Sequence, residues 1–155
     1  DLDKTIWDCY DAHGNDIWAK QMISPFKKSQ NTIIDDVGSK CILKPGILDY
    51  LKWLKKKRIR IFYCSVGAYY NLPKKFQPSL MLLNKFGILK MFDLNSVLKY
   101  KDFDKNLFLK KVKDASLFFD DNDKIIKKAS LIKNLRVYDA KEINDWKYLI
   151  KSEIC

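Results

Sequence analysis

The residues of this chain best suited to chemistry are four aspartates, which occur as two close pairs. Asp1 and Asp3 stand two positions apart, so both carboxylates point to the same side of an extended segment. Asp120 and Asp121 follow the apolar run 117–119, which places the second pair at the carboxyl end of a predicted strand. Carboxylates held together repel one another and need a cation or a shared proton. If the two pairs converge, they make an all-oxygen site suited to Mg²⁺.

In chain order, these residues resemble the motifs of the haloacid dehalogenase superfamily. Phosphatases of that superfamily carry DxDxT, then a Ser or Thr after the next strand, then a Lys, and finally an acidic pair. The matching positions here are Asp1, Asp3 and Thr5, then Ser65, then Lys101 or Lys105, then Asp120 and Asp121. More narrowly, residues 3–8, 43–45, 71–73 and 118–121 look like the magnesium-dependent phosphatase branch. The resemblance covers nearly the whole chain.

The resemblance implies covalent catalysis divided between two carboxylates. Asp1 would attack phosphorus and form an aspartyl-phosphate, while Asp3 would protonate the leaving oxygen and later activate water. The cofactor would be Mg²⁺, held by Asp1, by the backbone carbonyl of Asp3, and by Asp120 or Asp121. The ion would offset the repulsion between an anionic nucleophile and an anionic phosphate.

The resemblance also implies that a hydroxyl and a lysine hold the phosphoryl oxygens. Ser65, at the end of a predicted strand, supplies the hydroxyl. Two lysines are candidates for the cation: Lys101 in a predicted loop and Lys105 at the start of the helix that follows. Lys105 is preferred because it is in register with the apolar Leu109 and Val112.

From residue 59 onward, short apolar blocks alternate with longer amphipathic segments, which indicates βαβ units. We therefore expect an α/β fold, a three-layer sandwich with a central parallel sheet, Rossmann-like and of the haloacid dehalogenase type, with a small β-hairpin flap. The expected strands are 59–65, 94–98, 116–119 and 135–138. The expected helices are one opened by Pro45, one over 73–86 that ends at Gly87, two over 104–112 and 123–132, and one that starts from a capping box at 139–142.

Residues 8–44 do not show this alternation of apolar blocks and amphipathic segments. The apolar stretches 32–34 and 41–43 flank a short turn at 36–39, which predicts a β-hairpin. A flap at about 9–44 follows the first acidic motif directly, so we expect it to lie over or beside the site as a small lid. We expect one domain over 1–155, with a first strand of the family missing upstream of Asp1.

The composition is that of one globular domain. The chain has 155 residues, of which 47% are hydrophobic and 32% are charged. Its apolar runs are too short to cross a bilayer, so we expect no membrane contact and a cytoplasmic location. The four cysteines lie far apart without a CxxC motif, which favours free thiols over a zinc site.

The expected function is Mg²⁺-dependent hydrolysis of a phosphomonoester, on a small phosphorylated metabolite or a phosphorylated side chain. A net charge of +11 attracts polyanions and predicts weak, non-specific binding of nucleic acid. It leaves open an alternative function on the same fold, as a nucleic-acid-directed end-processing phosphatase or a polyanion-binding protein. A regulatory domain with a decayed site is disfavoured because both Asp1 and Asp3 are present.

Few other residues are candidates for function. Trp18, Tyr69 and Tyr70 would either line a substrate entrance or pack in the interior. His13, the single histidine, lies in a polar stretch and is expected at the surface or in the flap, since Asp3 already supplies the base. Cys64 falls in an apolar run and is expected to be a small buried residue.

Overall fold

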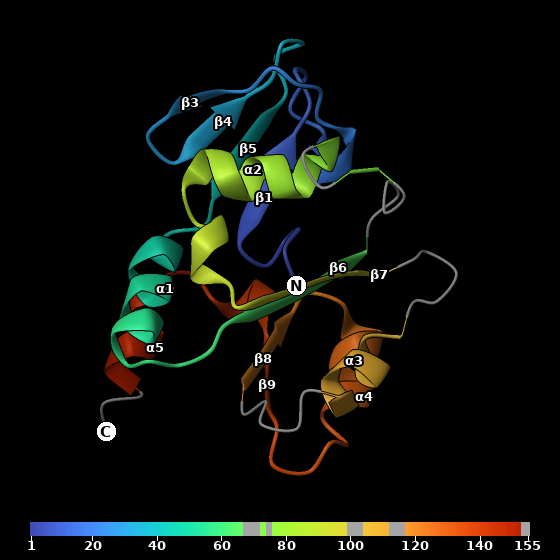
Figure 1. Cartoon of the computed structure of the whole chain (residues 1–155), viewed down its shortest axis with the longest axis vertical. Helices are drawn as coiled ribbons and strands as arrows, with labels where there is room; N and C mark the ends of the chain where they lie inside the picture. Colours follow the sequence, from blue (N-terminus) through green and yellow to red (C-terminus); the bar gives the residue numbers. More distant parts are fainter. Residues whose placement is uncertain (67–71, 74–75, 99–103, 112–116, 153–155) are drawn as a thin grey trace.

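The computed structural model describes residues 1–66, 72–73, 76–98, 104–111 and 117–152. A five-stranded antiparallel sheet forms the upper part of the molecule in Figure 1, and two separate parallel strand pairs lie below it. The antiparallel sheet has the order β2-β1-β5-β4-β3. Its strands are β1 (Trp7–Tyr10), β2 (Asp16–Ile17), β3 (Lys27–Ser29), β4 (Thr32–Ile34) and β5 (Lys40–Leu43).

Three strands of the antiparallel sheet, β1, β4 and β5, alternate between buried and more exposed residues, while β3 at the edge is exposed throughout. In β5, Cys41 and Leu43 are buried while Lys40 and Ile42 are exposed. The predicted hairpin is confirmed, since β4 and β5 pair antiparallel with Ile33 opposite Cys41. It is the inner part of a wider sheet, because β1 pairs with the other edge of β5.

Two parallel pairs follow in the chain. Strand β6 (Phe62–Val66) pairs with β7 (Leu94–Leu98), and β8 (Leu117–Asp120) pairs with β9 (Arg136–Asp139). The predicted strand at 94–98 is confirmed in full, and the other three strands lie within a few residues of their predicted positions. The βαβ pattern therefore predicted the local parallel pairs correctly.

The predicted three-layer sandwich with a central parallel sheet is wrong. The β6–β7 and β8–β9 pairs share no hydrogen-bonded ladder within the described part of the chain, and the largest sheet is antiparallel. Sequence periodicity shows which face of a strand is buried, but it does not show which strands become neighbours. At the end of β8, the carbonyl of Phe119 accepts a hydrogen bond from the backbone nitrogen of Asp1.

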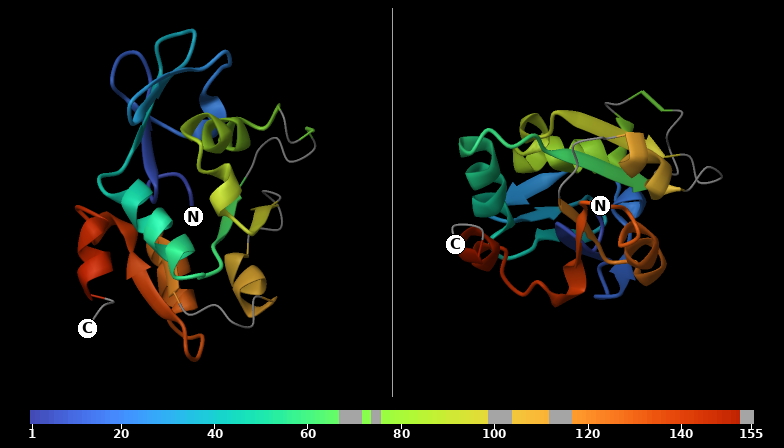
Figure 2. Two further views of the ribbon diagram at one scale, coloured as in Figure 1. Left: turned by 60° about the vertical axis from the view of Figure 1, so that its left-hand side comes forward. Right: turned by 90° about the horizontal axis from the view of Figure 1, so that it is seen from below.

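The helices lie beside the strands, with α2 against the antiparallel sheet and α3 and α4 near the parallel pairs (Figure 2). They are α1 (Ile47–Lys56), α2 (Pro78–Phe86), α3 (Lys105–Lys111), α4 (Asp123–Ala129) and α5 (Lys147–Ser152), with 3-10 turns η1 (Ala19–Gln21), η3 (Leu89–Met91) and η5 (Ala140–Glu142). As predicted, α2 ends at Gly87, which has a φ of 78°. The capping box at 139–142 does not start a long helix, because it gives only the turn η5. Among the described helices, none is long and apolar enough to span a bilayer.

One core joins the antiparallel sheet to the rest of the molecule. Helix α2 lies across the sheet, and the ring of Phe86 stacks on that of Trp7 with centroids 6.1 Å apart. On the other side of this core, Tyr50 of α1 packs against Trp146. The expected lid is thus part of the main core rather than an appended hairpin, since its strands supply several of the most buried side chains.

Candidate active site

The start of the chain is fixed beside the end of β8. The backbone nitrogen of Asp1 donates to the carbonyl oxygen of Phe119 at 3.0 Å. The next residue, Leu2, is fully buried in the main core, and its carbonyl accepts bonds from the nitrogens of Thr5 and Ile6. The buried leucine and the closed turn hold Asp1 next to the two acidic residues that end β8.

A buried lysine joins Asp1 to this acidic pair. The Nζ of Lys105, the first residue of α3, lies 2.8 Å from Oδ1 of Asp1 and 2.6 Å from Oδ2 of Asp120. The side chain of Lys105 is 3% exposed and that of Asp120 is fully buried. The other oxygen of Asp120 accepts a bond from the nitrogen of Asn122 at 3.0 Å. Both oxygens of Asp120 therefore have partners, and its charge is compensated.

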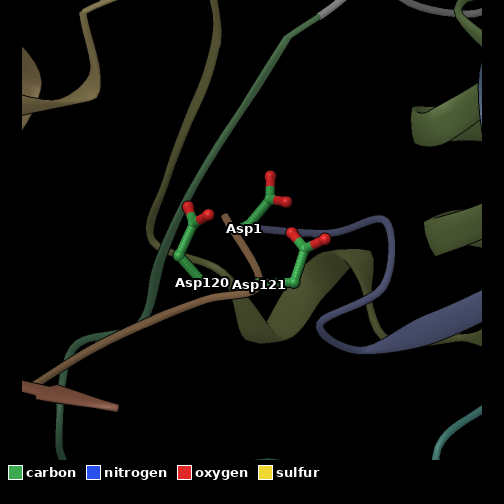
Figure 3. A group of neighbouring side chains, drawn as sticks. All are labelled: Asp1, Asp120 and Asp121. Atoms are coloured by element: carbon green, nitrogen blue, oxygen red, sulfur yellow. The ribbon is translucent and has the colours of Figure 1, made fainter. Parts of the chain in front are cut away.

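Three carboxylates lie close together at this site. Oxygens of Asp1, Asp120 and Asp121 all lie within 4.8 Å of one another. Figure 3 shows the three carboxyl groups on the same side of the two segments that carry them. Burial, followed by the charge of Asp120, raises the pKa of Asp121. Repulsion within the group thus acts on Asp121, the member that Lys105 does not contact.

The donor set fits a hard divalent cation. Burial, followed by the charge of Lys105, lowers the pKa of the Asp1 amine to about 5, so this amine is uncharged at neutral pH. Three carboxylates and one lysine then leave a net charge of about −2, which a divalent cation would cancel. Carboxylate oxygens are also the ligands that Mg²⁺ prefers.

Asp3 lies outside the group of three. Its Oδ1 accepts bonds from Nε1 of Trp7 at 2.8 Å and from the nitrogen of Ala19 at 2.9 Å. Burial raises the pKa of Asp3, and the bonds from Ala19 and Trp7 act in the opposite direction. Asp121 also contributes to the rise, so the two carboxylates are close enough to interact. Asp3 thus combines a raised pKa with a fixed side chain near the site, which suits a proton donor.

Of the two remaining residues expected to bind phosphate, Ser65 lies among the described residues and Lys101 does not. Ser65 lies in β6 and is buried, and its hydroxyl makes no hydrogen bond within the described part of the chain. Its neighbour Cys64 borders the site: burial raises the pKa of the thiol to about 11, with smaller effects from Lys105 and Asp120. The other expected lysine, Lys101, lies outside the described residues, as do Tyr69 and Tyr70.

The sequence did not predict several residues that contact the site. Trp7 and Ala19 bind Asp3, and nothing in their residue types indicates this. Cys64 was expected only as a small buried residue. Asn122 had a usable signal, since it is an N-cap residue directly before α4, and its backbone nitrogen binds Asp120.

A cavity of about 580 Å³ opens beside Asp121. Its apolar wall is made by Ile17 of β2 and by Trp18, whose side chain is 48% exposed. Lys44 lines the cavity from the segment between β5 and α1. Residues 16–18 and Lys44, which fall within the range expected for the flap, line this cavity, while His13 is exposed in the turn between β1 and β2.

The site therefore combines a buried cation with a group of carboxylates that could hold a metal, next to an open cavity. This combination is suited to the transfer of an anionic group, because each part offsets negative charge. A scan against protein-family models and a search of curated proteins both found no match for this chain.

Proposed function

We propose that this chain is a Mg²⁺-dependent phosphomonoester hydrolase that forms an aspartyl-phosphate on Asp1, and that its motifs are those of the haloacid dehalogenase superfamily. One observation carries the proposal: Lys105 is buried between Asp1 and Asp120, with the carboxylate of Asp121 alongside. Support comes from these side chains and not from the arrangement of strands. A purely structural ion pair would need one carboxylate for this lysine, whereas the chain brings three together.

Asp1 has one oxygen committed to Lys105 and one available. Its Oδ1 contacts the lysine, while Oδ2 has no hydrogen bond within the described residues. In the first step, Oδ2 bonds to phosphorus, the bond from phosphorus to the ester oxygen breaks, and that oxygen takes a proton from Asp3. In the second step, a water gives a proton to Asp3 and attacks phosphorus. The bond to Asp1 breaks, and inorganic phosphate leaves.

The remaining residues stabilise charge. Lys105 reduces the repulsion between Asp1 and an incoming phosphate, because its charge is held in a buried position. Ser65 can donate its unused hydroxyl to a phosphoryl oxygen. Mg²⁺, held by Asp1, Asp120, Asp121 and the carbonyl of Asp3, supplies further positive charge when it is bound.

The proposal is tested with Asp1→Asn. We expect this variant to lose hydrolysis of 4-nitrophenyl phosphate, since an amide oxygen does not attack phosphorus and is a weaker metal ligand. The native chain should be active with Mg²⁺ and inactive in excess EDTA. The matched control is Asp49→Asn, because Asp49 is exposed on α1, where it pairs with Lys147 at 3.2 Å.

The control should keep the native rate, and circular dichroism should show that both variants are folded. Unchanged turnover in Asp1→Asn would contradict the assignment of the nucleophile. Turnover by the native chain that persists in EDTA would contradict the metal dependence.

A further inference from the structure

The cavity beside Asp121 has a wall that the chemistry at Asp1 does not use. We propose that it binds the leaving group, and that it selects phosphomonoesters whose leaving group is a flat ring with a second anionic group. This inference rests on the proposed function, since it assigns the substrate class of the same site. At about 580 Å³, the cavity is large enough for a ring with one substituent.

Two of the three lysines that line the cavity already have acidic partners. Each of the two pairs with two carboxylates, so its charge is already offset by acidic partners. These ion pairs join Lys4 to Asp16 at 2.5 Å and to Asp8 at 3.8 Å, and Lys141 to Asp123 at 2.5 Å and to Asp139 at 3.6 Å.

Lys44 is the third lysine, and it has no carboxylate within ion-pair distance in the described part of the chain. Its backbone is fixed on both sides: its nitrogen donates to the carbonyl of Ile6 at 2.9 Å, and its carbonyl accepts from the nitrogen of Ile47 at 3.3 Å. The residue is half-buried. A half-buried cation without a partner attracts an anion more strongly than a solvated one does.

Among the carboxylates that line the cavity, Asp121 is the one without an ion pair to a lysine, and it is a member of the metal-binding group. When that group holds a cation, Lys44 is the lining side chain whose charge has no ionic partner. The cavity then borders the proposed phosphoryl site through Asp121 and carries one unpaired positive charge, that of Lys44, on its wall. This arrangement fits a substrate with two anionic groups, of which one is the phosphate.

Trp18 supplies the preference for a flat ring. Its indole is half-exposed at the cavity, where water would otherwise cover it. The backbone beside it is fixed, because the nitrogen of Trp18 donates to Oε1 of Gln21 at 2.8 Å and the nitrogen of Ala19 donates to Asp3. The aromatic wall is thus tied to a residue of the reaction centre, so a stacked ring would be held at a defined position.

The experiment compares two aryl phosphates that differ in one charge. The native chain should hydrolyse 4-carboxyphenyl phosphate with a kcat/KM about tenfold higher than that of 4-carbamoylphenyl phosphate, the factor expected for one charge-assisted contact. In Lys44→Gln the ratio should fall to about 1. Lys52→Gln, an exposed position on α1, is the matched control and should keep the native ratio. Trp18→Ala should raise KM for both compounds.

A ratio that is the same in Lys44→Gln as in the native chain would overturn the inference, while hydrolysis of both compounds would still support the proposed function. If the native chain hydrolyses neither compound, the proposed function fails, and binding then decides the inference. Calorimetry with Mg²⁺ would compare 4-carboxyphenylphosphonate with 4-carbamoylphenylphosphonate. A preference for the carboxylate that disappears in Lys44→Gln supports the site, and equal Kd values in the native chain refute it.

Discussion

Lys105 holds together two carboxylates that would otherwise repel each other in a buried place. Asp120 is fully buried, and its charge depends on Lys105 and on the nitrogen of Asn122. Because ionised carboxylates are costly to bury without a partner, the lysine is as much a part of the fold as of the site. Lys105 also contacts Asp1, so this one side chain contributes both to stability and to the arrangement of the proposed site.

We therefore expect Lys105→Met to be strongly destabilising. Loss of the positive charge leaves Asp120 buried without its ionic partner, which costs roughly 3–5 kcal/mol in the free energy of unfolding. Lys110→Met, at an exposed position of the same helix, should change this free energy by less than about 0.5 kcal/mol. Urea unfolding measures both, and millimolar Mg²⁺ should recover part of the loss at position 105. Equal stability of the two variants would contradict the importance of the ion pair.

Asp3 combines a structural role with a proposed catalytic one, and two substitutions separate them. In Asp3→Asn the amide oxygen still accepts from Trp7 and Ala19, so the fold should be kept while kcat falls by a factor of roughly 10²–10⁴. In Asp3→Ala both buried donors lose their acceptor, which costs about 1–3 kcal/mol for each unsatisfied group. Urea unfolding and steady-state kinetics of both variants test this. Full activity in Asp3→Asn would move the acid to another residue.

At the scale of elements, the start of α1 lies very close to the start of α5. Gly46 precedes α1 with a φ of 75°, and a Cβ there would lie 2.6 Å from the backbone nitrogen of Lys147. Gly87, after α2, has a similar φ of 78° but open space around the position of a Cβ. Substituting alanine at Gly87 therefore measures backbone strain alone, whereas substituting alanine at Gly46 adds steric overlap.

Gly87→Ala should cost about 1–2 kcal/mol, the strain of a left-handed backbone alone. Gly46→Ala should cost roughly 1–3 kcal/mol more, because the overlap forces the start of α5 away from α1. Thermal unfolding of both variants measures the difference. If the two alanines cost the same, the close approach of Gly46 to Lys147 would not contribute to stability.

At the scale of the whole molecule, the site lies where the antiparallel sheet meets the parallel strand pairs. Asp1 leads into the upper sheet through Trp7 of β1, while Asp120 ends β8 below it (Figure 1). The cavity spans the same junction, since Trp18 and Lys44 come from the upper part and Asp121 from the lower part.

The net charge of +11 should make the whole surface a weak attractor of polyanions. We expect short DNA duplexes to bind weakly, without preference for sequence, and with an affinity that falls steeply between 50 and 200 mM salt, by about 10³-fold or more if six phosphates are contacted. Fluorescence anisotropy with two unrelated duplexes measures this. Tight binding to one of them at physiological salt would favour the nucleic-acid-directed alternative.

The sequence by itself determined the local elements and the residue types of the site. The strand at 94–98, the hairpin of β4 and β5, and the end of α2 at Gly87 follow from apolar periodicity and turn residues, which act between near neighbours in the chain. The sequence likewise singled out both acidic pairs and gave Lys105 preference over Lys101. These inferences needed only motif order and helical register.

Only the tertiary structure decided which elements became neighbours. The periodicity of β6 and β8 shows that both are buried, but not that they lie in separate strand pairs, so the expected single parallel sheet was wrong. The partners of Asp3, the position of Cys64 beside the site and the uncompensated charge of Lys44 also depend on distant segments. Such contacts are set by the packing of one shared core, and their energies appear only when the whole chain is folded.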